Sequence, residues 1–486
     1  MTSIRRALAL SVSERYVLMA LALTSNVLIA RLLTPAEIGL YSVSVAVIGL
    51  AQVVRDFGIG SFLIQQKDLH LGHVRTAFGV SLVIGASLFA AVFMAAPLAA
   101  DFYSDPRIAT TLRISALNFL VLPFCTISLS LLRRDMQFGR IAMVTLGSSL
   151  IGFAATIGLV ASGFGPNGLA LGSVVSNVAT GGGAWLARRG ASLVWPSFSE
   201  WRAVLGFGGQ SAVANVVTSI AVDINDLALG KILGFAQVAM FSRGQGLMNL
   251  FHRDLMGAIR GVAYPSYARA HREGVALEPQ WSASVGALTA LAWPFYGFAS
   301  LFSLEMMRLL FGPQWDEAAR LVPFFCIAGA FAATSNLIFA SLLALGRIDL
   351  VTKAELTYQP LRAAFIVGVA VVFQSLFSCA FAFMIILSAH TPYAFWVKSK
   401  CLPTNWATLR AQLRASASVT LLTLALPAIW AWHHGLSRTE PMPLWQFFMT
   451  CVASLVLWVV AVQVSRHPLA DDPLFLRLTR CLAFNR

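Results

Sequence analysis

Long apolar runs separated by short polar turns fill almost the whole chain. Each run is about 20 residues long, which is the length that an α-helix needs to cross the hydrocarbon core of a bilayer. The pattern predicts about fourteen membrane-spanning helices. We expect them at residues 13–33, 39–61, 77–100, 108–131, 141–161, 167–187, 204–229, 236–258, 283–304, 318–345, 351–373, 375–397, 414–432 and 444–464. The sequence therefore predicts an all-α integral membrane protein, since the weak alternation of a membrane β-barrel is not seen in these runs.

Two of the connections between apolar runs have similar sequences. Ala30–Ser42 reads Ala-Arg-Leu-Leu-Thr-Pro-Ala-Glu-Ile-Gly-Leu-Tyr-Ser, and Gly230–Ser242 reads Gly-Lys-Ile-Leu-Gly-Phe-Ala-Gln-Val-Ala-Met-Phe-Ser without a gap. The copies begin about six spans apart, and an even offset keeps both repeats in the same direction across the membrane. We expect an N-terminal lobe at 1–190, a C-terminal lobe at 200–400, two additional spans at 410–465 and a cytoplasmic tail at 466–486.

Composition and charge agree with a membrane protein. Charged residues make up 12% of the chain and the mean hydropathy is +0.74, whereas a soluble domain has about 25% charged residues. With a cytoplasmic N-terminus, the inner segments carry about 25 Lys and Arg and the outer ones about 8, which places both ends in the cytoplasm. The net charge of +14 then mostly reflects the excess of Lys and Arg in the cytoplasmic segments. These residues are also attracted to anionic lipid headgroups. We expect membrane lipids as partners and no nucleic acid.

The span at 236–258 carries the most informative polar residues. At about 100° per residue they share one arc of the helix, which lipid cannot face. The stripe consists of Ser242, Gln245, Asn249, His252, Arg253 and Arg260. Two readings stay open: a polar seam satisfied by neighbouring helices, or the wall of a water-filled cavity that supplies cations.

Further ionisable residues lie in other spans. Asp223 and Asp226 are three residues apart and share a helix face, where two carboxylates in a low dielectric raise one another's pKa. This suits coupling to H⁺ or Na⁺, although Asp226 pairing with Lys231 or Arg243 is an equal alternative.

Basic residues in three other spans are further candidates for the cavity. Arg55, followed by Asp56, lies in the second span, and Arg15 and Arg362 lie close enough to span ends to reach the surface. Each is read either as a cation in the cavity or as an anchor at the membrane boundary.

Motifs typical of an enzyme are not found in the sequence. It has no Gly-rich phosphate loop of an ATPase, and no Asp-x-Asp cluster or long external loop of a glycosyltransferase. Its six cysteines show neither a disulfide framework nor a zinc-site spacing. We expect no metal, no cofactor beyond a coupling ion, and a transporter rather than an enzyme.

Several motifs resemble the bacterial polysaccharide transporters, the Wzx-type oligosaccharide flippases. They are Ala30–Tyr41, Asp56–Gly60, Asp226–Gly234, Tyr264-Pro-Ser-Tyr267, Leu310–Trp315 and Leu345-Gly-Arg347, in the order of that family. The resemblance covers about residues 10–400. The family belongs to a superfamily of two-lobed exporters that also contains lipid II flippases and multidrug antiporters.

The resemblance implies alternating access and a cationic central cavity for a lipid-linked diphosphate sugar. We therefore expect a flippase for undecaprenyl-diphosphate-linked oligosaccharide in the bacterial inner membrane, serving exopolysaccharide or O-antigen (lipopolysaccharide) synthesis. A polysaccharide polymerase and a chain-length regulator would be its further partners. The residues expected to bind substrate are Arg55, Arg253, Arg260, Gln245, Asn249, Arg15 and Arg362, and those expected to couple an ion are Asp226, Asp223 and Asp56.

Two alternatives remain at this point. A cation-coupled multidrug antiporter would need an acidic, aromatic-lined cavity, whereas the stripe here is basic and rich in amides. A membrane glycan polymerase or ligase would need catalytic groups on a large external loop.

Overall fold

The structure is a computed structural model that describes residues 2–55, 59–188, 195–202, 204, 225–435, 438, 440–471 and 475–476. Every regular element in these ranges is a helix, so the prediction of an all-α membrane protein is confirmed. Among these residues, ten helical stretches are long and apolar enough to cross a membrane, with Phe138–Ala187 counted as one, or 11 if the bent pair of α11 and α12 is one more span. The expected number of spans stays a prediction.

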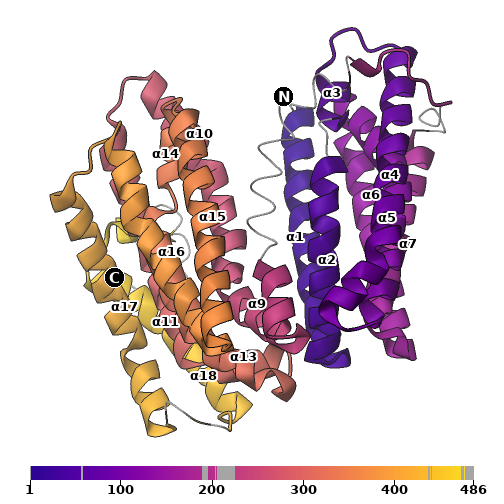
Figure 1. Cartoon of the computed structure of the whole chain (residues 1–486). Helices are drawn as coiled ribbons and strands as arrows, with labels where there is room; N and C mark the ends of the chain where they lie inside the picture. The colour runs from indigo at the N-terminus through magenta and orange to yellow at the C-terminus, as the bar shows by residue number, and fades with distance from the viewer. Residues whose placement is uncertain are drawn as a thin grey trace. The chain divides into compact units, whose positions relative to one another are not determined.

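The chain divides into two compact units, Met1–Ala239 and Met240–Arg486. The helices of the first unit are α1 (Thr2–Leu32), α2 (Pro35–Arg55), α3 (Ile59–Gln65), α4 (Leu71–Tyr103), α5 (Arg107–Arg134), α6 (Phe138–Leu159), the π-helical turn η1 (Val160–Phe164), α7 (Gly165–Ala187), a helical segment at 225–232 and the start of α9 (Phe235–Asn249). Within this unit α5 packs against both α4 and α7, and α6 packs along α7 (Figure 1). The expected lobe limits of 1–190 and 200–400 stay a prediction.

Small residues allow α6 and α7 to pack closely. A Cβ atom at Gly172 would overlap the side chain of Thr156, and one at Gly152 would lie 2.5 Å from the Cβ of Ser176. Small residues at such interfaces increase van der Waals contact, which replaces the hydrophobic effect between helices in lipid. At the end of the hairpin Gly163 has a φ of 85°, a left-handed conformation that lets the chain reverse.

The first copy of the repeated sequence begins α2 with a capping box. The Thr34 backbone N–H and hydroxyl donate to Glu37 Oε2 at 2.9 and 2.8 Å, and the Glu37 N–H donates back to Thr34 Oγ1 at 3.4 Å. Pro35 stands at the first helical position, where its missing N–H costs nothing. The motif Thr-Pro-Ala-Glu is therefore a helix start. In the second copy Gly234, with a φ of 92°, stands where the first has Thr34.

The second unit continues α9 and includes the remaining helices. They are the π-helical turn η2 (Leu250–Leu255), α10 (Met256–Arg272), α11 (Leu277–Leu301), α12 (Ser303–Leu310), the 3₁₀ turn η3 (Pro313–Trp315), α13 (Asp316–Ser335), α14 (Ile338–Ala344), α15 (Ile348–Phe373), α16 (Leu376–Ser399), α17 (Trp406–His433), α18 (Leu444–Val464) and the 3₁₀ turn η4 (Pro468–Asp471). In this unit α11 lies against both α13 and α17, and α16 lies against α13 and α15 (Figure 1). A bend of 82° separates α11 from α12.

The last two long helices are fixed to α11 by buried polar contacts. Ser416 of α17 donates to the Gly286 carbonyl at 3.0 Å, and Trp458 Nε1 of α18 donates to the Ala290 carbonyl at 2.9 Å. At the α12 end, Arg438 forms a bidentate ion pair with Glu305, with two N–O distances of 2.7 Å. The two added helices are therefore part of the second unit and are not a loose appendix.

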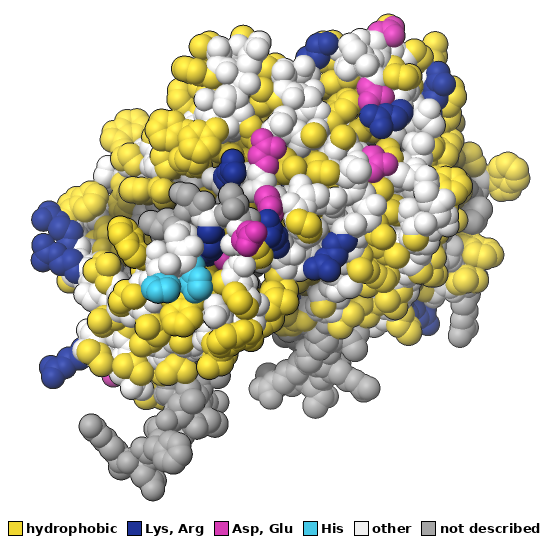
Figure 2. Space-filling view, turned by 90° about the horizontal axis from the view of Figure 1, so that it is seen from below, with side chains coloured by type: hydrophobic (Ala, Val, Ile, Leu, Met, Phe, Trp, Pro, Cys, Tyr) yellow, Lys and Arg dark blue, Asp and Glu magenta, His cyan; other side chains and the backbone are white. Residues whose placement is uncertain are grey.

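Large apolar side chains remain exposed on the long helices. Met94, Leu98, Val372, Leu421 and Trp432 are each at least 70% exposed. Figure 2, which shows the molecule from below, has hydrophobic side chains interspersed with acidic, basic and histidine side chains on that face. Exposed apolar patches of this extent are expected on helices that face lipid.

The buried ion pair predicts a difference between two arginine substitutions. Arg438→Ala would leave the Glu305 carboxylate, which is 1% exposed, without its partner, and should lower the free energy of unfolding by about 3 kcal/mol or more. Arg107→Ala removes an ion pair with Asp105 in which the arginine is 56% exposed, and should cost under about 1 kcal/mol. Denaturant unfolding of both purified variants in detergent measures this; equal losses would contradict the prediction.

Candidate functional site

Two arginines predicted from the sequence lie in the second unit, on different helices. Arg260, on α10, is half-buried, and its Nη1 donates to Asn336 Oδ1 at 3.5 Å, just after the end of α13. Arg362, on α15, is also half-buried. Neither guanidinium is therefore freely exposed on the outside of its helix.

Two histidines lie close enough to these arginines to feel their charge. His252, in the π-helical turn η2, interacts electrostatically with Arg260. His390, on α16, interacts electrostatically with both Arg362 and His252. We call His252, Arg260, Arg362 and His390 the basic cluster. It collects side chains from η2, α10, α15 and α16 at one place in the second unit.

Aromatic and acidic side chains border the basic cluster. The ring of Tyr358 packs on His390 with centroids 4.2 Å apart, and Phe339 packs on the same imidazole at 5.8 Å. Glu355, which accepts a hydrogen bond from Gln359 at 2.7 Å, interacts electrostatically with Arg362. Two guanidinium groups near one carboxylate leave the described part of this site cationic.

A π-helical turn interrupts the polar stripe predicted on the span 236–258. The turn η2 covers Leu250–Leu255, and the extra residue rotates everything after it by about 100° relative to a regular α-helix. Gln245 and Asn249, before the turn, are half-buried, whereas Arg253, within it, is exposed. The angles predicted for a regular helix therefore hold only up to Asn249.

The other predicted site residues are not brought to the basic cluster. Arg15 is exposed on α1, and Asp226 is half-buried in the helical segment at 225–232 of the first unit. Arg55 is the last residue of α2, and its side chain, like Asp56 and Asp223, lies outside the described residues. Roles for these residues in substrate binding or ion coupling stay predictions.

His390 and Asn336 were not among the residues predicted from the sequence. His390 lies in the predicted span 375–397, and an ionisable residue within a span is itself a signal of a cavity or a partner. Asn336 gave no such signal, because an amide near the end of a helix is common. Only folding brings its side chain to Arg260.

The first unit contains a separate, partly polar cavity of about 410 Å³ between α3, α4, α5 and α7. Hydroxyl, amide and guanidinium groups line it: Ser81, Thr126, Ser130, Arg133, Asn177 and Thr180. Asn177 Nδ2 also donates to Asn118 Oδ1 at 2.7 Å, which fixes the amide orientation. Such groups can hydrogen-bond sugar hydroxyls or water.

The chain matches the family model described as polysaccharide biosynthesis protein over residues 28–320, more than half of its length. The chain belongs to this family. The family resemblance drawn from the sequence motifs is thereby confirmed. Of the basic cluster, His252 and Arg260 lie within the matched range, and Arg362 and His390 lie beyond it.

Named relatives include two polysaccharide biosynthesis proteins, one of which is named a transport protein. The lipopolysaccharide biosynthesis protein WzxC of Escherichia coli (strain K12) is 23% identical over 344 residues, which is 69% of each chain. The succinoglycan biosynthesis transport protein ExoT of Rhizobium meliloti (strain 1021) is 23% identical over 292 residues, 60% of this chain and 59% of ExoT.

A solved structure also has the same fold. The lipid II flippase MurJ, in its inward closed conformation, aligns with a TM-score of 0.73 over 98% of this chain and 99% of MurJ, at 11% identity. At that identity the likeness establishes the fold alone.

Replacing the arginines of the basic cluster should impair polysaccharide production. Losing one charge-assisted hydrogen bond to an anionic group costs about 1.5–3 kcal/mol, so Arg260→Gln or Arg362→Gln should each lower output about tenfold to hundredfold. Lysine at either position should retain part of the output, since the charge stays while the bidentate geometry is lost. Polymer is quantified in a deletion strain that expresses each variant.

Arg269→Gln is the matched control, because Arg269 lies on the same helix as Arg260, is exposed and forms an i,i+4 ion pair with Glu273 at 2.7 Å. It should leave output unchanged. Membrane abundance of each variant is measured in parallel. Normal polymer output from the Arg260→Gln, Arg362→Gln double variant would remove the basic cluster from the site.

Proposed function

We propose that this protein moves undecaprenyl-diphosphate-linked oligosaccharide across the bacterial inner membrane for exopolysaccharide or O-antigen synthesis. The basic cluster is the observation that carries the proposal. A diphosphate has at least two negative charges, and it has to cross about 30 Å of hydrocarbon. Buried ions are stabilised only by close partners of opposite charge, and guanidinium groups bind phosphate oxygens bidentately. Arg260 and Arg362 are placed to supply such partners.

An apolar cavity next to η2 supports the proposal that the substrate is linked to a lipid. It has a volume of about 530 Å³, and α11, α17 and α18 form it together with Leu250, Phe251 and Leu255 of η2. The turn that carries His252 towards the basic cluster thus also lines an apolar cavity. A polyprenyl chain in this cavity would place its diphosphate near the basic cluster, which gives the two added helices a role in binding substrate.

The contact between the two repeat copies fits alternating access. A Cβ atom at Gly39 would overlap the Phe235 carbonyl, and one at Gly230 would lie 2.6 Å from Val43 Cγ2. Nearby, Lys231 donates to the Phe102 carbonyl. The Lys and Arg distribution predicts that these segments lie on the outer side of the membrane. Release of the oligosaccharide there requires the two copies to separate.

The alternatives are less well supported. A multidrug transporter of the MATE family aligns with a TM-score of 0.58, but at 16% identity this shows fold alone. Cationic drugs are repelled by a basic cluster. A glycan polymerase or ligase is disfavoured by the transport names of relatives such as ExoT. Cytoplasmic termini, coupling to H⁺ or Na⁺ through Asp226, and contacts with a polymerase or chain-length regulator are further parts of the proposal.

Translocation in proteoliposomes tests the proposed function. Purified protein should move fluorescent undecaprenyl-diphosphate oligosaccharide between leaflets, as measured by the fraction that an added glycosidase can reach. Cysteines at Val43 and Gly230, in a background without native cysteines, should cross-link and stop translocation until reductant is added.

A second cysteine pair is the control for this experiment. Thr111 Oγ1 of α5 donates to Asn167 Oδ1 of α7 at 2.9 Å. Because this contact joins two packed helices of the first unit, a cross-link between cysteines at these positions should leave translocation intact. Absence of translocation by the reduced, folded protein would overturn the flippase proposal. Translocation that persists in the cross-linked Val43→Cys, Gly230→Cys protein would overturn only the alternating-access step.

A further inference from the structure

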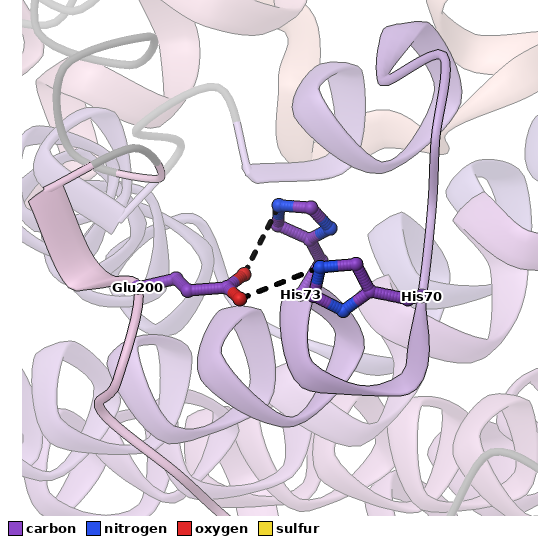
Figure 3. A group of neighbouring side chains, drawn as sticks. All are labelled: His70, His73 and Glu200. Atoms are coloured by element: carbon purple, nitrogen blue, oxygen red, sulfur yellow. Dashed lines mark ion pairs between the residues drawn. The ribbon is translucent and has the colours of Figure 1, made fainter.

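Three side chains with metal-binding atoms converge at one end of α4. His70 precedes the helix, His73 lies in its first turn, and Glu200 comes from the segment 195–202 (Figure 3). Their ligand atoms all lie within 4.8 Å of one another. They are distant from the basic cluster in the chain and belong to the first unit.

The distances match the edges of a metal coordination tetrahedron. Glu200 Oε1 lies 3.4 Å from His70 Nε2, and Glu200 Oε2 lies 3.0 Å from His73 Nε2. Two ligands bound to Zn²⁺ at about 2.05 Å in tetrahedral geometry are about 3.3 Å apart. Each imidazole nitrogen therefore lies at a ligand-like distance from one oxygen of the same carboxylate, and the three ligand atoms lie within 4.8 Å of one another.

Without an ion, these two contacts are ion pairs that require both histidines to be protonated (Figure 3). Glu200 Oε2 is buried and has no hydrogen-bond partner among the described residues, although it lies 3.0 Å from His73 Nε2. A buried carboxylate oxygen without a hydrogen bond costs about 1–3 kcal/mol or more. A metal ion bound between Glu200 Oε2 and His73 Nε2 would give this carboxylate oxygen a partner without a proton on the imidazole nitrogen.

The surrounding structure holds the three groups in place. The His70 and His73 rings stack with centroids 3.9 Å apart, and the edge of His73 packs on Phe62 at 5.7 Å. A Cβ atom at Gly72 would lie 2.9 Å from His70 Nδ1, so the glycine gives that ring its room. Both imidazoles are thus oriented before any ion binds.

The segment that carries Glu200 is docked on α4 independently of the histidines. Arg75 Nε donates to the Trp195 carbonyl at 3.0 Å, and the Ser197 N–H donates to the Arg75 carbonyl at 3.1 Å. A Cβ atom at Gly79 would lie 2.5 Å from the Ser197 carbonyl oxygen, so α4 has a glycine where the segment crosses it. The Glu200 carboxylate is therefore carried by a backbone segment that these contacts hold against α4.

We propose that His70, His73 and Glu200 bind a Zn²⁺ ion, with water as the fourth ligand, and that the ion clamps the segment 195–202 to α4. Two imidazoles and one carboxylate favour zinc or a similar transition metal over Mg²⁺ or Ca²⁺, which bind oxygen ligands. In the sequence this segment follows α7 and leads towards the second repeat copy. The clamp fixes the start of that connection to the first unit.

Zinc retention by the full-length protein tests the site. The protein is purified in detergent with a tag that binds no metal, stripped with chelator, loaded with Zn²⁺ and desalted. Metal analysis should find about one ion per chain, as for a structural site. Retention should fall at least tenfold in His73→Ala and in Glu200→Gln, the latter keeping the shape of the side chain. The His433→Ala, His434→Ala variant is the control and should retain the ion.

Hydrogen exchange tests the clamp. Zn²⁺ should slow exchange of the backbone amides in 195–202 in the wild-type protein and have no effect in Glu200→Gln. Size-exclusion chromatography shows that each variant is folded. The proposal is overturned if folded wild-type protein retains no zinc. It is also overturned if a His70→Ala, His73→Ala, Glu200→Gln triple variant retains as much zinc as the wild-type protein. Retention without slower exchange would overturn the clamp.

Discussion

Hydrocarbon solvates a charged group poorly, so every guanidinium or carboxylate within a membrane protein has to be held by other protein groups or by water. Burial inside the protein, away from water, imposes the same requirement. Glu305 and Arg438 are almost fully buried and satisfy one another bidentately. In the basic cluster, by contrast, two arginines have one described carboxylate nearby. The first arrangement stabilises the fold, and the second gathers two guanidinium groups and two imidazoles at one place in the second unit.

The same constraint links the last two helices to function. Buried polar contacts fix α17 and α18 to α11, so they add a rigid apolar wall to the second unit. That wall encloses the cavity beside η2, where the regular helix gives way to a π-helical turn. An amphipathic substrate needs both surfaces next to each other, a cationic one for its diphosphate and an apolar one for its chain.

The two repeat copies serve different local purposes despite their similar sequences. In the first copy Thr34 and Glu37 cap α2, while in the second Gly234 adopts a left-handed conformation before α9. Gly39 and Gly230 have no side chain where the two copies touch. A sequence motif shared within a family can thus encode a helix start and a close backbone contact, and need not contain any residue that binds substrate.

The sequence by itself determined the membrane class, the helical fold, the repeat and the family, because each depends on patterns that are local or repeated along the chain. Apolar runs of bilayer length require helices in lipid, whatever their neighbours are. The sequence also singled out Arg260 and Arg362, since an arginine within a span requires a partner or a cavity.

Only the tertiary structure decided which of these residues meet. The π-helical turn at Leu250–Leu255 changed the phase of the stripe, and such a turn depends on packing more than on residue type. His390 and Asn336 joined the arginines from other helices. His70, His73 and Glu200 come together because the segment 195–202 crosses α4 at Gly79. Contacts between residues far apart in sequence follow from the packing of whole helices, and no local pattern encodes them.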